Sequence, residues 1–106
     1  MQAISDTMSI LSGKWKFHIL GTLIEGSKLG FMDLLREVHG IGTKMLSKEL
    51  QDLEMNHLIS RTVMDTKPIT VKYSLTEYGA TLSPLINELA KWGIEYRQSI
   101  YSAKDN

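Results

Sequence analysis

The chain has 106 residues, enough for one domain with a real hydrophobic core and too few for two. Hydrophobic residues make up 42% of it, as in ordered globular proteins and unlike disordered tails. No apolar run approaches the ~20 residues of a bilayer-spanning helix, and the N-terminal segment lacks the basic start of a signal peptide. Because the chain has no cysteine, it has no disulfide, thiolate metal site or thiol switch of its own. We therefore expect a cytoplasmic protein that is stabilised by packing alone.

The formal net charge is +0, which argues mildly against a nucleic-acid-binding domain, since such domains are often basic. The position of the charges matters more than their sum. One central segment holds the basic residues Lys44, Lys48, Arg61, Lys67 and Lys72, and also the acidic residues Asp52, Glu54 and Asp65. Any basic face must therefore arise from folding. If the protein binds DNA, we expect weak non-specific binding and reliance on a dimer.

Three helices are predicted before residue 40. The first covers Ala3 to Leu11, with Ile4, Met8 and Leu11 on one side. The second runs from about Lys14 to Glu25, and Gly26 ends it, because glycine accepts the left-handed conformation of a helix end. Its inward side chains are predicted to be Trp15, Ile19, Leu20, Leu23 and Ile24. The third is a short apolar-periodic segment that contains Leu34, Leu35 and Val38, and a turn with Gly40 and Gly42 follows it.

The fourth predicted helix, at about residues 43–56, has two different faces. At about 100° per residue, Leu46, Leu50 and Leu53 fall within an arc of about 60°, and His57 lies in that arc at the helix end. The opposite face carries long hydrogen-bond donors, with two hydroxyl residues at its edge: Lys44, Lys48 and Gln51, then Thr43 and Ser47. Gly42 or Thr43 can cap this helix, and its free first-turn N–H groups suit a phosphate oxygen.

A β-hairpin is predicted at about residues 58–75. Side chains alternate along both strands, and Val71, Tyr73 and Leu75 share one face of the second. Pro68 lies in the connection, where no ladder hydrogen bond is needed. Helix, tight turn, helix and hairpin is the order of a winged helix-turn-helix, which places one helix in the DNA major groove and the hairpin on the backbone. We expect one mainly α domain over residues 1–106 with a small β-hairpin wing, an α+β fold.

A long C-terminal helix is predicted from about Glu77 to Tyr101, with Thr76 as its cap. Pro84 should bend or divide it. Its apolar stripe is about 120° wide and contains Leu82, Leu85, Ile86, Leu89, Trp92, Gly93, Tyr96 and Ile100. Unbroken, the helix would span ~37 Å, more than the ~33 Å of a compact domain of this size. The excess apolar surface indicates a second subunit.

Three stretches together resemble the HxlR-type transcriptional regulators, a family within the winged helix-turn-helix class. They are LSGKWKFHIL, GFMDLLREVHGIGTKMLSKELQDLEMNHLISRTV and PITVKYSLTEYGATLSPLINELAKWG, and they cover most of the chain. Their combination in this order is specific, although no single piece is. The resemblance implies a bacterial-type regulator that binds double-stranded DNA as a homodimer through its first and last helices. We expect the dimer interface to contain Met8, Leu11, Leu89, Trp92 and Tyr96.

The resemblance also implies which residues meet DNA. Thr43, Lys44, Ser47 and Lys48 occupy the recognition-helix positions, and Lys67 and Lys72 the wing positions. Gln51 joins them from the residue pattern alone. Arg61 joins them as a phosphate contact, and a surface ion pair stays open as the alternative for this residue. Three features differ from many family members: Gly30 replaces an Arg, Gly42 replaces a Ser, and the N-terminal Cys is missing. The last difference excludes thiol sensing by this chain.

Other interpretations of individual residues are weaker. The spacing of His18, His39 and His57 fits no ligand pattern, so we expect no metal. The chain has no Gly-rich phosphate loop, no nucleophile elbow and no adjacent acid pair, so we also expect no other cofactor and no enzymatic activity. Lys14 and Lys16 are expected to be solvated, and Trp15 and Trp92 to act as packing anchors.

Two alternative functions stay open. One is a winged-helix module that binds protein, which salt dependence would distinguish from a DNA-binding one. The other is a DNA-binding regulator of a different winged-helix family with a ligand pocket at the dimer interface, which an apolar cavity near Trp15 and Trp92 would favour. The operator should be near-palindromic, but the sequence does not identify it. A small-molecule effector is a further possible partner, which the sequence does not identify either.

Overall fold

The computed structural model describes residues 1–105, with side chains up to residue 102. Within this part the chain forms six helices and three strands. In chain order they are α1 (Gln2–Leu11), α2 (Lys16–Gly26), β1 (Lys28–Gly30), α3 (Phe31–Glu37), α4 (Thr43–Met55), β2 (Ile59–Met64), β3 (Thr70–Leu75), α5 (Glu77–Ala80) and α6 (Ser83–Asp105). The predicted fold class, mainly helical with a small hairpin, is confirmed.

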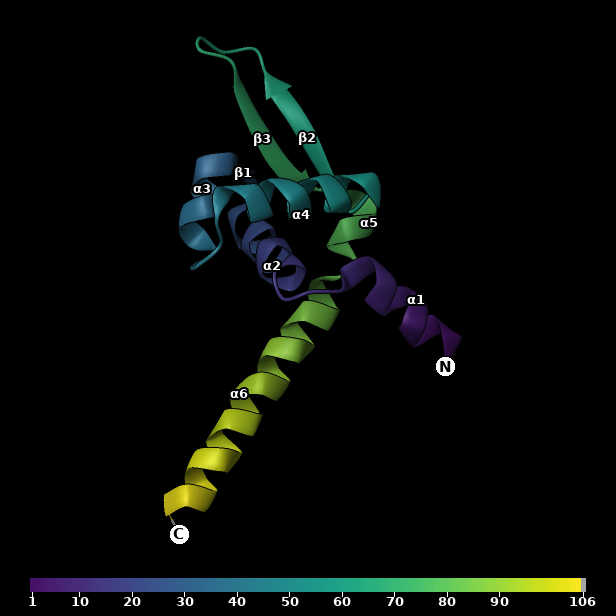
Figure 1. Cartoon of the computed structure of the whole chain (residues 1–106), viewed down its shortest axis with the longest axis vertical. Coiled ribbons are helices and arrows are strands. Elements are labelled where there is room, and N and C mark those ends of the chain that lie inside the picture. Colours follow the sequence, from purple (N-terminus) through teal and green to yellow (C-terminus); the bar gives the residue numbers. More distant parts are fainter. Residues whose placement is uncertain (106) are drawn as a thin grey trace.

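The long C-terminal helix is divided into α5 and α6, as the position of Pro84 predicts. Thr76 caps α5, since its hydroxyl accepts a hydrogen bond from the Gly79 N–H at 2.9 Å. Pro84 is the second residue of α6, in the first turn, where a missing N–H breaks no intrahelical hydrogen bond. The interruption falls at Thr81 and Leu82, so α6 begins in a new direction (Figure 1).

The sheet has three antiparallel strands in the order β1-β3-β2. Strands β2 and β3 form the predicted hairpin. In the structure Ile59 lies opposite Leu75 at its base, and Met64 lies opposite Thr70 at its far end. Strand β1 was not predicted. It pairs with β3 over three residues, centred on Leu29 opposite Tyr73. A three-residue segment is too short for the alternation of side chains to reveal a strand.

The core lies where α2, α3 and α4 meet the base of the sheet. Its buried side chains come from helices α1 to α4, from the turn after α3 and from residues 58–59 at the start of β2. They are mostly leucine and isoleucine: Leu11, Ile19, Leu20, Leu23, Leu34, Val38, Ile41, Leu46, Leu50, Leu53, Leu58 and Ile59. Trp15 packs against this core as predicted, but it precedes α2 as the N-cap residue and is not within the helix.

His57 does not join the core, contrary to the prediction from helical periodicity. Helix α4 ends at Met55, and His57 has a positive φ of 61° and an exposed side chain. The His57 N–H donates to the carbonyl of Glu54, and the Leu58 N–H donates to the carbonyl of Leu53, both at 3.0 Å. This is a Schellman ending, which turns the chain so that Leu58 is buried and His57 points outward.

The molecule is elongated, with extents of 59 × 33 × 23 Å. Its radius of gyration is 16.0 Å, whereas a compact chain of this length would have about 13 Å. Helix α6 projects from one end of the body, and the β2–β3 hairpin projects from the opposite end (Figure 1). Helix α1 extends away from the body beside the start of α6. None of the described helices is both long and apolar enough to span a bilayer.

Candidate nucleic-acid interface

Helix α4 presents a polar face to solvent, as its sequence pattern predicts. Leu46, Leu50 and Leu53 are fully buried against the body. The predicted contact residues of this helix are all exposed: Thr43, Lys44, Ser47, Lys48 and Gln51. The helix therefore offers two ammonium groups, an amide and two hydroxyls on one open surface. These groups are typical donors to phosphates and base edges.

Gly42 is the N-cap residue of α4, and Thr43 is its first helical residue. No side chain caps the helix, because glycine has none to offer. The Leu46 N–H bonds to the carbonyl of Gly42 at 2.9 Å, and the N–H groups before it have no side-chain acceptor from the N-cap. The start of α4 therefore keeps donors that can meet an external acceptor.

The three predicted wing residues lie in different surroundings. Arg61 is exposed on β2, and with Ser47 and Gln51 it lines a shallow depression of about 470 Å³ between α4 and the sheet. Lys67 is exposed in the connection between the strands. Lys72 lies on the inner strand β3, half-buried, with its ammonium 4.0 Å from the carboxylate of Asp33.

Asp33 links α3 to the sheet. Its carboxylate accepts hydrogen bonds from the Gly30 N–H at 3.0 Å and from Arg36 at 2.9 Å. The Gly30 hydrogen bond, then Arg36 and Lys72, lower the pKa of Asp33 below its usual value. Gly30 is the N-cap residue of α3. The positive charge of Lys72 is partly balanced inside the subunit before any DNA is present.

Lys16 was expected to be solvated, and the structure contradicts this. It is 6% exposed, and its ammonium lies 2.6 Å from the carboxylate of Glu49 and 3.5 Å from that of Asp52. Burial alone lowers the pKa of Lys16, but the hydrogen bond and charge of Glu49, with Asp52, outweigh it and raise the pKa above its usual value. Glu49 carried no signal in the sequence, because a charged residue on a helix is normally solvated.

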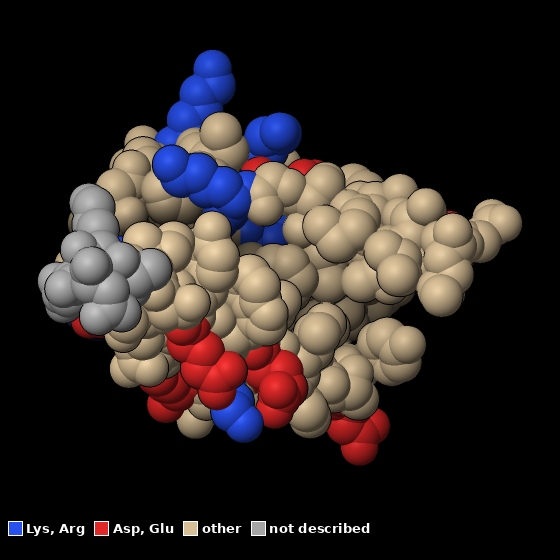
Figure 2. Space-filling view, turned by 90° about the horizontal axis from the view of Figure 1, so that it is seen from below, with Lys and Arg blue, Asp and Glu red and all other residues tan. Residues whose placement is uncertain are grey.

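Folding separates the balanced charges of the chain. Viewed from the α6 side, most of the visible Lys and Arg side chains gather along one edge, and most of the Asp and Glu side chains along the opposite edge (Figure 2). Uncharged surface lies between them. A net charge of zero is therefore compatible with a basic edge, as expected if the basic face arises from folding.

Helices α1 and α6 carry large apolar side chains that are exposed to solvent. Trp92 is 65% exposed, and it stacks on Tyr96 with ring centroids 5.1 Å apart. Leu89 and Met8 are also exposed. Leu11 differs from the predicted interface set, since it is 2% exposed and belongs to the subunit's own core. It therefore anchors α1 to the body, and the prediction that Leu11 faces a second subunit is corrected.

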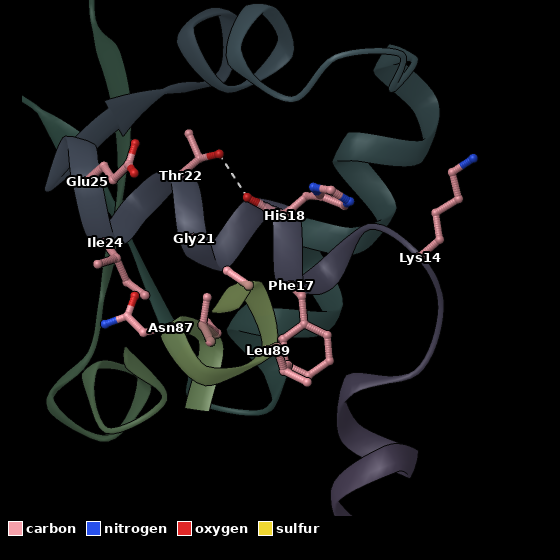
Figure 3. Close-up of a pocket in the computed structure, with 11 residues that line it drawn as sticks. Lys14, Phe17, His18, Gly21, Thr22, Ile24, Glu25, Asn87 and Leu89 are labelled. Atoms are coloured by element: carbon pink, nitrogen blue, oxygen red, sulfur yellow. Dashed lines mark hydrogen bonds between the residues drawn. The ribbon is translucent and has the colours of Figure 1, made fainter. Parts of the chain in front are cut away.

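A depression of about 640 Å³ lies between α2 and α6 and is open to solvent (Figure 3). Its lining mixes apolar residues such as Phe17 and Leu89 with polar ones such as His18 and Asn87. Neither Trp15 nor Trp92 is among the residues that line it. Among the described residues, no cluster of His, Asp or Glu side chains could hold a metal ion.

These elements define a winged helix-turn-helix: α3, the turn at residues 38–42, α4, and the β2–β3 wing beside it. The HxlR-like helix-turn-helix family profile matches residues 10–101, and the chain belongs to this family. It is 38% identical to an HTH-type transcriptional regulator of Halalkalibacterium halodurans, over 84% of this chain and 79% of the relative. The protein is therefore a transcriptional regulator of the winged helix-turn-helix type, and the alternative of a different winged-helix family is excluded.

Solved structures agree with this assignment. The reduced form of the redox regulator HypR superposes with a TM-score of 0.86 and 32% identity, over 94% of this chain and 98% of HypR. The HTH-type regulator YtcD gives 0.84 and 34%, over 92% and 99%. HypR is named a redox regulator. The present chain has no cysteine, so it has no thiol that could be oxidised.

Proposed function

We propose that the protein regulates transcription as a homodimer that binds a near-palindromic operator. The observation that carries this proposal is the arrangement of two exposed surfaces on one subunit. Helix α4 and the wing lie toward one end, and α6 projects at the other (Figure 1). The side chains of Leu89, Trp92 and Tyr96 on α6 are exposed. A partner subunit on α6 would leave α4 free to meet DNA.

In this proposal α4 enters the major groove. Lys44, Lys48 and Gln51 reach base edges and phosphates, and Thr43 and Ser47 act beside them near the helix start. The wing lies on the flanking backbone, where Lys67 meets phosphate. Arg61, at the junction of α4 and the sheet, reaches the backbone between the two. Lys72 contributes less, because Asp33 already neutralises part of its charge.

The second subunit covers the apolar surfaces of α1 and α6. Leu89, Trp92 and Tyr96 are exposed on one stripe of α6, and aromatic side chains of this kind often dominate interfaces. Met8 on α1 is exposed as well and suits a place across the two-fold axis. Two-fold symmetry of the dimer then places two α4 helices on two half-sites, about one helical turn of DNA apart.

Selection of DNA from a random pool by the purified protein tests the proposal. An enriched sequence with two inverted half-sites is expected, and its affinity should fall steeply with salt. A pool without enrichment, or binding that does not respond to salt, would contradict DNA recognition. An enriched single half-site, with a monomer in sedimentation at micromolar concentration, would contradict the dimer.

A further inference from the structure

Lys16 and Glu49 form a buried ionic link between α2 and α4. Both residues are 6% exposed, and their charged atoms are 2.6 Å apart. Asp52, one turn further along α4, lies 3.5 Å from the same ammonium group. Among the described residues, no buried side-chain nitrogen or oxygen lacks a hydrogen-bond partner. The link thus leaves no fully buried polar atom without a partner, although its two charges are almost removed from water.

Such a link is poorly explained by stability alone. Burying two charges costs solvation free energy, and apolar side chains of similar volume often stabilise a fold as well or better. A buried ion pair instead restricts the orientation of the helices that it joins, here the rotation of α4 about its axis. Contacts of Leu46, Leu50 and Leu53 are apolar and tolerate small rotations of α4, whereas a short hydrogen bond tolerates little.

The rotation of α4 matters because it also sets the positions of the exposed side chains that are proposed to contact DNA. Groups at the helix surface lie roughly 5–6 Å from the axis, so a rotation of roughly 10° moves them by about 1 Å. A displacement of that size lengthens a hydrogen bond of ~2.9 Å beyond its useful range. Glu49 directly follows Lys48 in the chain, so holding the one orients the other.

We propose that Lys16 is a positioning residue for DNA recognition, which holds Glu49 and Asp52 and thereby sets the rotation of α4 about its axis. This inference rests on the proposed function. It assigns to Lys16 an effect on the discrimination between operator and other DNA, which a purely structural role would not produce. Non-specific binding depends on phosphate charge and tolerates rotation of the helix.

The test compares affinities for a selected operator and for an unrelated duplex of equal length at one salt concentration. In Lys16→Met/Glu49→Met the pair is replaced by apolar side chains without a change in net charge. We expect a folded protein whose operator-to-unrelated affinity ratio falls at least tenfold, while binding to the unrelated duplex changes little. The matched control is Lys91→Met/Glu95→Met, an exposed pair on α6, which should keep the wild-type ratio.

A folded double variant with the wild-type ratio would overturn the inference. If the double variant does not fold, the same affinity ratio is measured for Lys16→Arg, which keeps the charge and changes the geometry of the link. A lowered ratio for Lys16→Arg supports positioning, and an unchanged ratio overturns it. If the wild type itself does not discriminate between sequences, the proposed function fails, and this inference fails with it.

Discussion

Gly79 lies so close to the carbonyl oxygen of Leu58 that a Cβ at position 79 would overlap that oxygen. The hydroxyl of Thr76 reinforces the junction, since it donates to the carbonyl of His57 at 2.7 Å. The first turn of α5 is thus seated on the chain reversal that ends α4. Helix α4 is thus held at its C-terminal end by a close backbone contact that only glycine at position 79 permits.

Gly79→Ala should therefore destabilise the protein. The added methyl group forces the backbone of α5 away from Leu58, and overpacking of this kind costs about 1–3 kcal/mol. Thermal or urea unfolding measures the loss. The matched control is Gly21→Ala in α2, where a Cβ meets only ordinary contact with Ile86 at 3.8 Å. That change should be neutral or stabilise by up to about 1 kcal/mol. Equal effects of the two substitutions would refute this account.

Lys44→Ala or Lys48→Ala should weaken operator binding by about 1–3 kcal/mol where the lysine reads a base, and should weaken all DNA binding alike where it meets a phosphate. Both side chains are exposed opposite the buried leucines of α4. Fluorescence anisotropy with the selected operator measures the change. Lys91→Ala on α6 is the control and should bind normally. If the Lys44→Ala/Lys48→Ala protein binds like the wild type, α4 does not contact DNA as proposed.

The wing should act through phosphate contacts. Lys67→Ala should lower the slope of log affinity against log salt by about 1, and should leave the preferred sequence unchanged. Lys72→Ala should change the slope less, because Asp33 lies 4.0 Å from the Lys72 ammonium and balances it within the subunit. Titrations at several salt concentrations compare the two variants. A larger effect for Lys72, or a new preferred sequence for Lys67→Ala, would contradict this assignment.

Substitution of an acidic side chain in the apolar stripe of α6 should separate the subunits. Leu89→Asp or Tyr96→Asp places a charge in a surface that the proposal buries, and should give a monomer or an unfolded chain. Either outcome should abolish tight operator binding. Sedimentation at micromolar concentration is the measurement. Lys91→Asp, on the opposite, polar side of α6, should remain dimeric. A folded Tyr96→Asp monomer with undiminished operator affinity would refute the dimer.

Acid should weaken the link between α3 and the sheet. The pKa of Asp33 is lowered in the folded protein, mainly by the Gly30 N–H and by Arg36. The charged carboxylate therefore contributes stability above its ordinary pKa of 3.8, and that contribution is lost as pH falls through the lowered value. At pH 7 the wild-type protein should have a higher melting temperature than the Asp33→Asn variant.

The difference between the two melting temperatures should narrow as the pH falls below 3.8. Asp6→Asn, on the exposed surface of α1, serves as the control for a change of charge alone. A difference between wild type and Asp33→Asn that persists undiminished at pH 2 would show that the carboxylate charge is not the cause.

Local patterns in the chain were sufficient for most of the fold. Three of these patterns are local in the sequence. They are the spacing of the buried leucines of α4, the alternation of side chains in the hairpin and the position of Pro84. Helical and extended periodicity depend only on neighbouring side chains, so these features can be read without the rest of the molecule. The winged helix-turn-helix class, and the exposed polar face of α4, followed from them.

Only the tertiary structure decided which residues meet across the chain. Lys16 and Glu49 are separated by 33 positions and look like two solvated charges until the core brings α2 against α4. Leu11 and Trp92 both looked like interface residues, and only packing buries the first and exposes the second. Strand β1 exists because β3 lies beside it. Long-range pairing depends on the shape of the whole core, which local periodicity does not contain.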